Sequence, residues 1–271
     1  MKTKPIGLSI LIVVALCALV SAQEGLPRVV QTYLTGIEGR LAAEPSVQEW
    51  NGTIFDLDYK YLFNKPAVDY RTGSTDAWLV GYQVGVLKGK TGSLLARLVL
   101  IDGKGNEFFR FPDPSREEVI DDGFYTDGIV ITVAPNVYLL AMSSRAGRKT
   151  PGSVTVQTLE QNPRELLAYR DTNFPAEPGI ESDLYFYDVN DDGRKELLVE
   201  QQVLHFSTGQ KEMQQQVFSL ESNNQSFANV TSSYQSQLAV IFAAARNNPE
   251  TPKIKQQSRP YDPTLFETPA P

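Results

Sequence analysis

The sequence predicts a mainly β protein: an antiparallel β-sandwich followed by a smaller β-unit, with short helices near both ends. Apolar and polar side chains alternate over residues 53–63 and again over 77–87, as expected for half-buried strands. Glycine-rich segments at 88–92 and 102–106 have the composition of hairpin turns. Further strands are expected at 128–133, 137–143 and 153–159, so that roughly seven short strands make up the sandwich.

Two segments have the periodicity of amphipathic helices. The first, over residues 27–43, begins behind a proline and places on one face Val30, Tyr33, Leu34, Ile37 and Leu41. The second, over 231–246, places on one stripe Tyr234, Leu238, Ile241, Phe242 and Ala245. The strands of the smaller β-unit are expected between them, at 184–188, 196–206, 212–221 and 226–230.

These elements divide the chain into six parts. They are a signal peptide (1–22), a helical lead-in (23–50), the β-sandwich domain (51–160), a linker (161–183), a β-unit with a docking helix (184–246) and a tail (247–271). The linker contains three prolines and residues of mixed polarity. The tail contains six prolines and few large apolar residues, so we expect it to be disordered.

Residues 1–22 have the three parts of a secretory signal peptide. Two lysines are followed by an apolar run from Ile6 to Val20 and by small residues that end at Ala22. The apolar run is shorter than the roughly 20 residues of a spanning helix, which disfavours an uncleaved anchor. A lipid anchor on Cys17 is disfavoured because a leucine precedes it, where lipoprotein signals have a small residue. We therefore expect export and cleavage before Gln23.

Cleavage would remove Cys17, the only cysteine, so the mature chain would form no disulfide. It would also remove two of the 25 basic residues, which leaves 23 against 32 acidic residues and a formal charge of −9. No cluster of five or more basic residues occurs, so nucleic acids and anionic membrane surfaces are poor partners. The composition favours a bacterial protein that is periplasmic, exposed at the cell surface or secreted.

The run DVNDDGRKEL, residues 188–197, is the strongest chemical motif in the chain. Oxygen-bearing side chains stand at alternate positions, and Gly193 permits the sharp turn that wraps a chain around a hard cation such as calcium. The candidate ligands are Asp188, Asn190, Asp192, the main-chain carbonyl of Arg194, and Glu196. Calcium takes six to eight oxygen ligands, and this set provides five or six. A turn of Asx and glycine residues without a metal would use the same residue types.

An EF-hand is excluded because Val199 stands where that motif has its bidentate glutamate, and because the flanking segments are strands. The strand–DxNxDGxxE–strand unit resembles the calcium loop of FG-GAP and VCBS-type repeats, which occur in integrin-like propellers and bacterial exported proteins. The resemblance covers roughly residues 184–230 and implies that the five candidate residues bind calcium. A propeller needs at least four blades, whereas this chain has one copy of the loop. A single bound calcium would hold the two strands of one hairpin together.

A second resemblance concerns the sandwich. The run VAPNVYLLAM, residues 133–142, is similar to a strand of immunoglobulin-like domains, with Tyr138 in place of the tyrosine that closes a corner there. The cysteine and tryptophan landmarks of those domains are absent. This resemblance implies an immunoglobulin-like sandwich and carries no information about function.

Three other signals are weaker. Residues 85–93, GVLKGKTGS, lack the spacing of a phosphate-binding loop and join two strands, so we expect a hairpin. His205, the only histidine, lies in a β run with no nucleophile motif nearby, so we expect it to be a structural strand residue. Acidic residues that a glycosidase would use are expected instead on solvent-facing positions and in turns; they are Asp56, Asp58, Asp121, Asp122 and Asp127.

Taken together, the sequence predicts an exported, non-enzymatic binding or structural protein of the cell surface or periplasm, with a structural calcium site. Its partner would be another surface protein or a glycan. One alternative is a carbohydrate-binding accessory module, which would need an exposed row of aromatic side chains. A second alternative is a secreted hydrolase that depends on a pair of carboxylates in a cleft. Neither alternative needs a membrane span in the mature chain.

Overall fold

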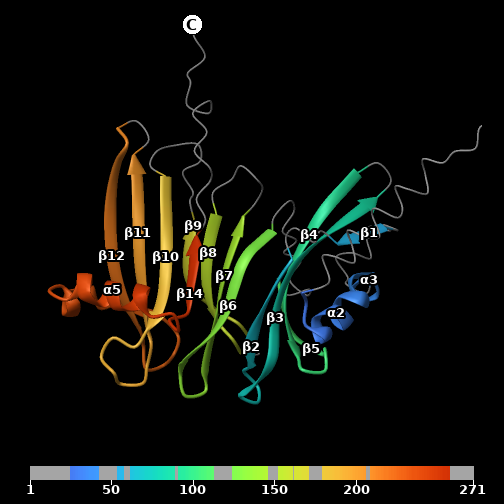
Figure 1. The fold of residues 1–271 in the computed structure, drawn as a ribbon, viewed down its shortest axis with the longest axis horizontal. Helices are drawn as coiled ribbons and strands as arrows, with labels where there is room; N and C mark the ends of the chain where they lie inside the picture. The colour runs from blue at the N-terminus through green and yellow to red at the C-terminus, as the bar shows by residue number, and fades with distance from the viewer. Residues whose placement is uncertain are drawn as a thin grey trace, which may run out of the picture.

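Three antiparallel sheets stack face to face, with helices on the two outer faces (Figure 1). The computed structural model describes residues 25–42, 54–57, 62–88, 91–112, 124–145, 152–160, 162–170, 179–205 and 208–256. The expected signal peptide, with Cys17, lies outside the described residues. The predicted mainly β, sandwich-type fold is confirmed, and it contains one more layer than a simple sandwich.

The first sheet, sheet A, is built around a long central strand. Its strands are β1 (Ile54–Leu57), β2 (Phe63–Asp69), β3 (Ser74–Lys88), β4 (Thr91–Asp102) and β5 (Glu107–Phe111). Strand β3 pairs with β4 on one side, while β1 and β2 both pair with it on the other. The continuous strand predicted over residues 53–63 is therefore two strands. Lys88 pairs with Thr91, so the run over 85–93 is a hairpin, as predicted.

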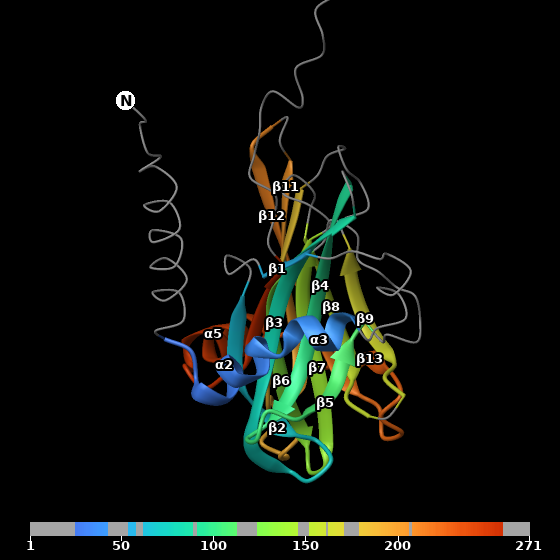
Figure 2. The same cartoon turned by 90° about the vertical axis from the view of Figure 1, so that its right-hand side faces the viewer.

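In the part of sheet A whose side chains are described, both faces contribute residues to a core. The outer face, which includes Val80, Tyr82 and Val99, packs against helices α2 (Arg28–Thr35) and α3 (Ile37–Ala42), as Figure 2 shows from the side. The predicted helix over 27–43 is thus confirmed, with a break at Gly36. All five residues predicted for its apolar face are buried. The Tyr33 hydroxyl also donates a hydrogen bond of 2.5 Å to a carboxylate oxygen of Glu107.

The middle sheet, sheet B, is a four-stranded meander of β6 (Phe124–Ala134), β7 (Val137–Arg145), β8 (Gly152–Thr158) and β9 (Glu165–Arg170). Alternate residues of β7 enter different cores. Leu140 and Met142 pack against sheet A, whereas Leu139 and Ala141 pack against the third sheet. The middle sheet therefore has almost no face of its own towards water.

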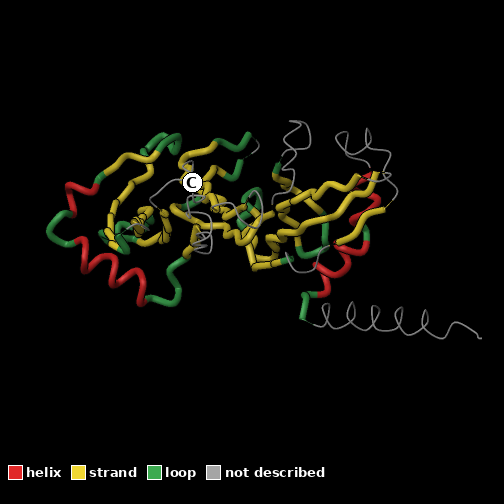
Figure 3. Tube along the Cα trace, turned by 90° about the horizontal axis from the view of Figure 1, so that it is seen from above, coloured by secondary structure: helices red, strands yellow, loops and turns green. Residues whose placement is uncertain are grey.

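The third sheet, sheet C, contains β10 (Gly179–Tyr187), β11 (Glu196–His205), β12 (Gln210–Leu220), β13 (Phe227–Asn229) and β14 (Lys253–Gln256). A 3₁₀ helix, η2 (Thr231–Tyr234), and helix α5 (Leu238–Asn247) cover its outer face. The stripe predicted for this helical segment is confirmed, because all five of its residues belong to the core between α5 and the sheet. Figure 3, viewed from above, shows helices at both ends of the layered strands.

Two predictions about the chain's organisation are wrong in part. The linker predicted over 161–183 contains β9, whose residues pair with β8. The tail predicted from 247 contains β14, which pairs with β10 and buries Ile254. The core between sheets B and C also joins residues that had been assigned to two separate β-units.

The connectivity differs from that of an immunoglobulin-like sandwich, in which strands follow Greek-key connections. Strands β2–β5, β6–β9 and β10–β13 each follow one another as a meander within one sheet. Tyr138 packs at the core between sheets A and B. The immunoglobulin-like resemblance therefore holds for the sandwich architecture and not for the order of strands.

Candidate functional site

The candidate calcium loop connects β10 to β11 at the lower end of sheet C in Figure 1. Its turn needs two residues with positive φ, Asp191 at 56° and Gly193 at 82°. Glycine adopts this conformation without a steric cost, and aspartate tolerates it better than most residues. The loop thus has the sharp reversal that was expected from Gly193.

Three of the predicted ligands turn their oxygens into the loop. The carboxylate of Asp188 accepts hydrogen bonds from the backbone N–H groups of Asp192, at 3.1 Å, and Gly193, at 2.8 Å. The same Asp192 N–H lies 3.3 Å from Oδ1 of Asn190. The Asp192 carboxylate accepts from the backbone N–H of Arg194, at 2.8 Å, and from the Asn190 amide, at 3.0 Å. The loop is therefore held by its own side chains.

Glu196, the fourth side chain of the predicted set, lies beside this group. It is the first residue of β11, only 4% exposed, and its Oε2 accepts a hydrogen bond of 3.0 Å from the backbone N–H of Val189. Burial raises the pKa of Glu196, and the negative charges of Asp192 and Asp188 raise it further. An almost buried carboxylate next to two others is a costly arrangement unless a cation or a proton offsets the repulsion.

The donor set fits calcium by its chemistry, since it consists of carboxylate, amide and main-chain oxygens. Within the part of the chain that the structure describes, no three His, Cys, Asp or Glu side chains form a group that could hold a metal ion. Asp188, Asn190 and Asp192 are brought together, while Glu196 is engaged by Val189. Only Oε2 of Glu196 accepts that hydrogen bond, so its second oxygen, Oε1, is the one that would coordinate an ion together with the other three side chains.

The loop is anchored to the middle sheet, which the sequence did not indicate. The backbone N–H of Lys195 donates to the carbonyl oxygen of Val133 in β6, at 2.8 Å, and its ammonium group lies 3.2 Å from the carbonyl oxygen of Thr132. A guanidinium nitrogen of Arg194 lies 3.5 Å from the carbonyl oxygen of Leu220 in β12. The loop therefore contacts both its own sheet and sheet B.

Tyr234 was predicted only as a core residue, and the structure places its phenol near the loop. Burial raises the pKa of Tyr234, and the charges of Glu196 and Asp192 raise it further. The segment that leads into α5 thus borders the candidate site. The position of Tyr234 near the loop could not be predicted from the sequence, because its place in the apolar stripe of the helical segment already accounts for an aromatic residue there.

The other candidate groups do not form a site among the described residues. Asp127 makes an ion pair with Lys65 at 2.5 Å and accepts a hydrogen bond from the Gly128 N–H, so it links β6 to β2. His205 ends β11, and its side chain lies outside the described part, as does that of Asp56. Asp58, Asp121 and Asp122 also lie outside the described residues.

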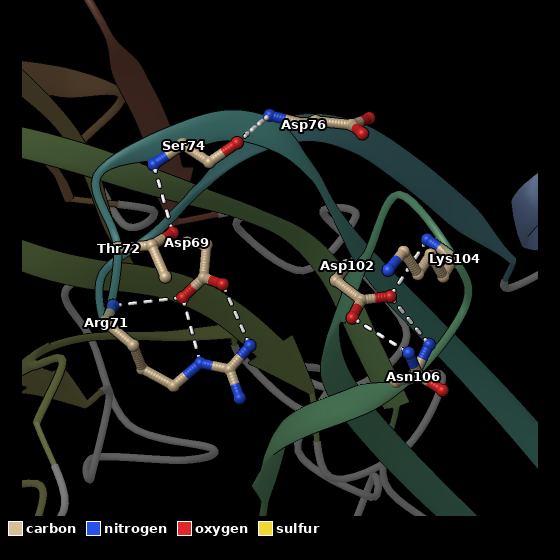
Figure 4. Close-up of polar contacts among 8 residues, drawn as sticks. All are labelled: Asp69, Arg71, Thr72, Ser74, Asp76, Asp102, Lys104 and Asn106. Carbon is tan, nitrogen blue, oxygen red and sulfur yellow. Dashed lines mark hydrogen bonds and ion pairs between the residues drawn. The ribbon is translucent and has the colours of Figure 1, made fainter.

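A second polar cluster lies where the β2–β3 and β4–β5 turns meet (Figure 4). The carboxylate of Asp69 accepts from the backbone and guanidinium N–H groups of Arg71, at 2.8 to 2.9 Å. The carboxylate of Asp102 accepts from the backbone N–H groups of Lys104 and Asn106 and from the Asn106 amide, each at 2.9 Å. Each carboxylate accepts its hydrogen bonds from residues of its own turn, so the cluster stabilises the two hairpins.

Comparison with known proteins gave no match for this chain. No model of a known protein family matches the chain, and no curated protein is significantly similar to it. Among the helices that the structure describes, none is long and apolar enough to cross a membrane.

Proposed function

We propose that this chain is an exported, non-enzymatic binding or structural protein of the cell surface or periplasm, in which calcium stabilises the loop over residues 188–196. The observation that supports the calcium site is the convergence of oxygens from Asp188, Asn190 and Asp192 beside the almost buried Glu196. Export is proposed from the three-part leader over residues 1–22.

Calcium would supply positive charge to three neighbouring carboxylates, and Asp188, Asn190, Asp192 and Glu196 would hold it. The loop would then be fixed more firmly between β10 and β11 and against β6, where Lys195 bonds to Val133. The role proposed for the cation is therefore structural.

Thermal unfolding of the purified mature protein, with calcium and with a chelator, tests the site. Saturation at about 100 times the dissociation constant adds roughly 2.7 kcal/mol, which raises the melting temperature by about 5–10 °C for a chain of this size. Asp192→Ala should abolish the calcium-dependent shift. A melting temperature that is the same with calcium and chelator would show that the loop is only a turn.

The matched control is Asp191→Asn. Asp191 is exposed and has a φ of 56°, a conformation that asparagine tolerates and alanine does not, so this variant removes one charge without straining the turn. It should keep the calcium-dependent shift. Intact-mass analysis of exported protein tests the localisation separately, and a first residue other than Gln23 would contradict the proposed cleavage.

The glycan-binding alternative is not supported by a specific observation. Every phenylalanine, tyrosine and tryptophan whose side chain the structure describes is buried or half-buried. A row of exposed rings on which sugars stack is therefore not found in that part of the molecule.

A further inference from the structure

The loop over residues 188–196 takes part in the hydrophobic core beneath helix α5. Three residues of α5 are buried in this core, together with residues of β10, β11 and β12; they are Ile241, Phe242 and Ala245. Val189, the second residue of the loop, packs against the same core with its half-buried side chain. Its backbone N–H is the group that donates to Oε2 of Glu196. One loop residue therefore holds the buried carboxylate of the candidate site and also packs against the core of α5.

A second set of contacts joins the loop to the start of α5. Tyr234, in η2, packs against the same core, and the charges of Glu196 and Asp192 act on its phenol and raise its pKa. The carbonyl oxygen of Tyr234 accepts a hydrogen bond of 2.8 Å from the backbone N–H of Gln237. The carbonyl oxygen of Gln237 accepts one of 3.0 Å from the backbone N–H of Ile241, in the first turn of α5. Tyr234 thus lies between the loop and the helix.

Helix α5 has little stability of its own. It contains 10 residues, fewer than the roughly 12–15 that an isolated helix needs in water. Gln237, at its N-terminal end, makes no side-chain capping hydrogen bond, and the first turn has no acidic residue to offset the helix dipole. The helix therefore depends on its packing against sheet C. Part of that packing is an edge-on contact between the rings of Phe242 and Tyr185, in the strand that leads into the loop, with 6.5 Å between their centroids.

We propose that calcium at the loop controls how firmly α5 is docked on sheet C. This inference rests on the calcium site proposed above. Without a cation, the neighbouring carboxylates of Asp188, Asp192 and Glu196 repel one another, and the loop opens more often. With a cation the loop is fixed, and Val189 and Tyr234 stay in the core that holds α5. The helix is then the element through which the site acts on the outer face of sheet C.

The effect must be reciprocal. If calcium strengthens the docking of α5, docking of α5 strengthens the binding of calcium by the same factor, which is typically about 5- to 150-fold between coupled sites. Helices α2 and α3 serve as the internal control. They pack against sheet A in a different core, at the other end of the layered strands (Figure 3).

Amide hydrogen exchange of the purified mature protein, followed by NMR with calcium and with a chelator, tests the coupling. Calcium should slow exchange in α5 by at least about 5-fold and leave exchange in α2 nearly unchanged. Asp192→Ala should abolish this difference, and Asp191→Asn should retain it. Equal slowing in α2 and α5 would show only a general rise in stability and would overturn the proposal.

The reciprocal measurement is the calcium affinity, by isothermal titration calorimetry. Ile241→Ala removes a buried side chain that holds α5 on sheet C, and it should weaken calcium binding by at least about 5-fold. The matched control is Ile37→Ala, which truncates the same type of buried side chain on α3, against sheet A. It should bind calcium like the wild-type protein. Circular dichroism should show that both variants keep their β structure.

The outcomes separate this inference from the site on which it rests. A wild-type protein that binds no calcium, by calorimetry and by melting temperature, would contradict the site itself and this inference with it. Calcium binding without slower exchange in α5, and with equal affinities for Ile241→Ala and Ile37→Ala, would leave the site intact and overturn the coupling alone. Slower exchange in α5 together with weaker binding by Ile241→Ala supports the proposal.

Discussion

The backbone N–H of Lys195, the last residue of the loop before β11, donates a hydrogen bond of 2.8 Å to the carbonyl oxygen of Val133 in β6. This bond joins the loop between β10 and β11 to the middle sheet. A change in the stability of the loop should therefore alter the stability of sheet B as well as that of sheet C.

Calcium should slow amide hydrogen exchange at Lys195 as well as at Asp192 and Gly193. The last two N–H groups are bonded to the Asp188 carboxylate, and Lys195 is bonded to β6. A cation that fixes the loop reduces its local opening. Exchange measured by NMR with calcium and with chelator checks this, and Asp191→Asn should give the wild-type result. Slowing at Asp192 without any at Lys195 would show that the loop is not coupled to sheet B.

Asp69→Asn should destabilise the fold at neutral pH by about 1–3 kcal/mol, because the buried carboxylate loses charge-assisted bonds to Arg71. Bonding to Arg71 lowers the pKa of Asp69 in the folded state. Its stabilisation is thus complete well above the unfolded pKa of about 3.9 and is lost as the pH falls through the folded pKa. Urea unfolding at several pH values should show the difference between variant and wild type shrinking below about pH 4.

The control for that experiment is Asp76→Asn, which removes a charge from an exposed side chain in β3, close to the same turn. It should change stability by less than about 0.5 kcal/mol. A pH dependence that is the same for both variants would contradict the role assigned to the Asp69–Arg71 pair.

Gly81→Ala should destabilise the protein by about 1–3 kcal/mol, since a Cβ at this position would overlap the ring of Phe63 on the paired strand. An aromatic ring over a glycine is a recurrent way to stabilise a strand pair. In a Phe63→Ala background the same change should cost much less. A double-mutant cycle by chemical denaturation measures this coupling, and additive effects would show that the ring and the glycine act independently.

Ile254→Ala should cost about 2–5 kcal/mol, because this side chain is 2% exposed and belongs to the core between sheets B and C. Lys253→Ala, on the exposed side of β14, is the control and should have little effect. A chain that ends at Gln256 should keep its melting temperature, and one that ends at Asn248 should lose much of its stability. Equal stability of the two truncated chains would show that β14 is dispensable.

The alternation of apolar residues predicted most strands because packing on one face follows a period of two. The same rule failed for β14, where Lys253 and Lys255 alternate with Ile254 and give a short, polar sequence. Lysines of this kind are common on edge strands, where they discourage further pairing. Strand β9 was missed for another reason, because its four apolar residues, Leu166 to Tyr169, follow one another without alternation and stand in a segment with three prolines.

The number of layers could not be deduced from alternation alone. Residues 128–142 are nearly continuously apolar, which is typical of strands buried on both faces, and this signal indicates an inner sheet. The sharp turn of the candidate loop could be predicted because its residues act locally, through hydrogen bonds over a few positions. Its contacts with Val133 and Tyr234 depend on how distant segments pack, and no local pattern carries that information.

The three sheets follow the chain in order, so sheet B is synthesised before the partner that covers its second face. A nascent chain that has reached the end of β9 carries Leu139, Ala141 and Val156 on a face open to water. Such intermediates aggregate readily, and chaperones bind them for that reason. A chain in which β10–β14 are not yet in place is thus a state in which this apolar face is open to misassembly.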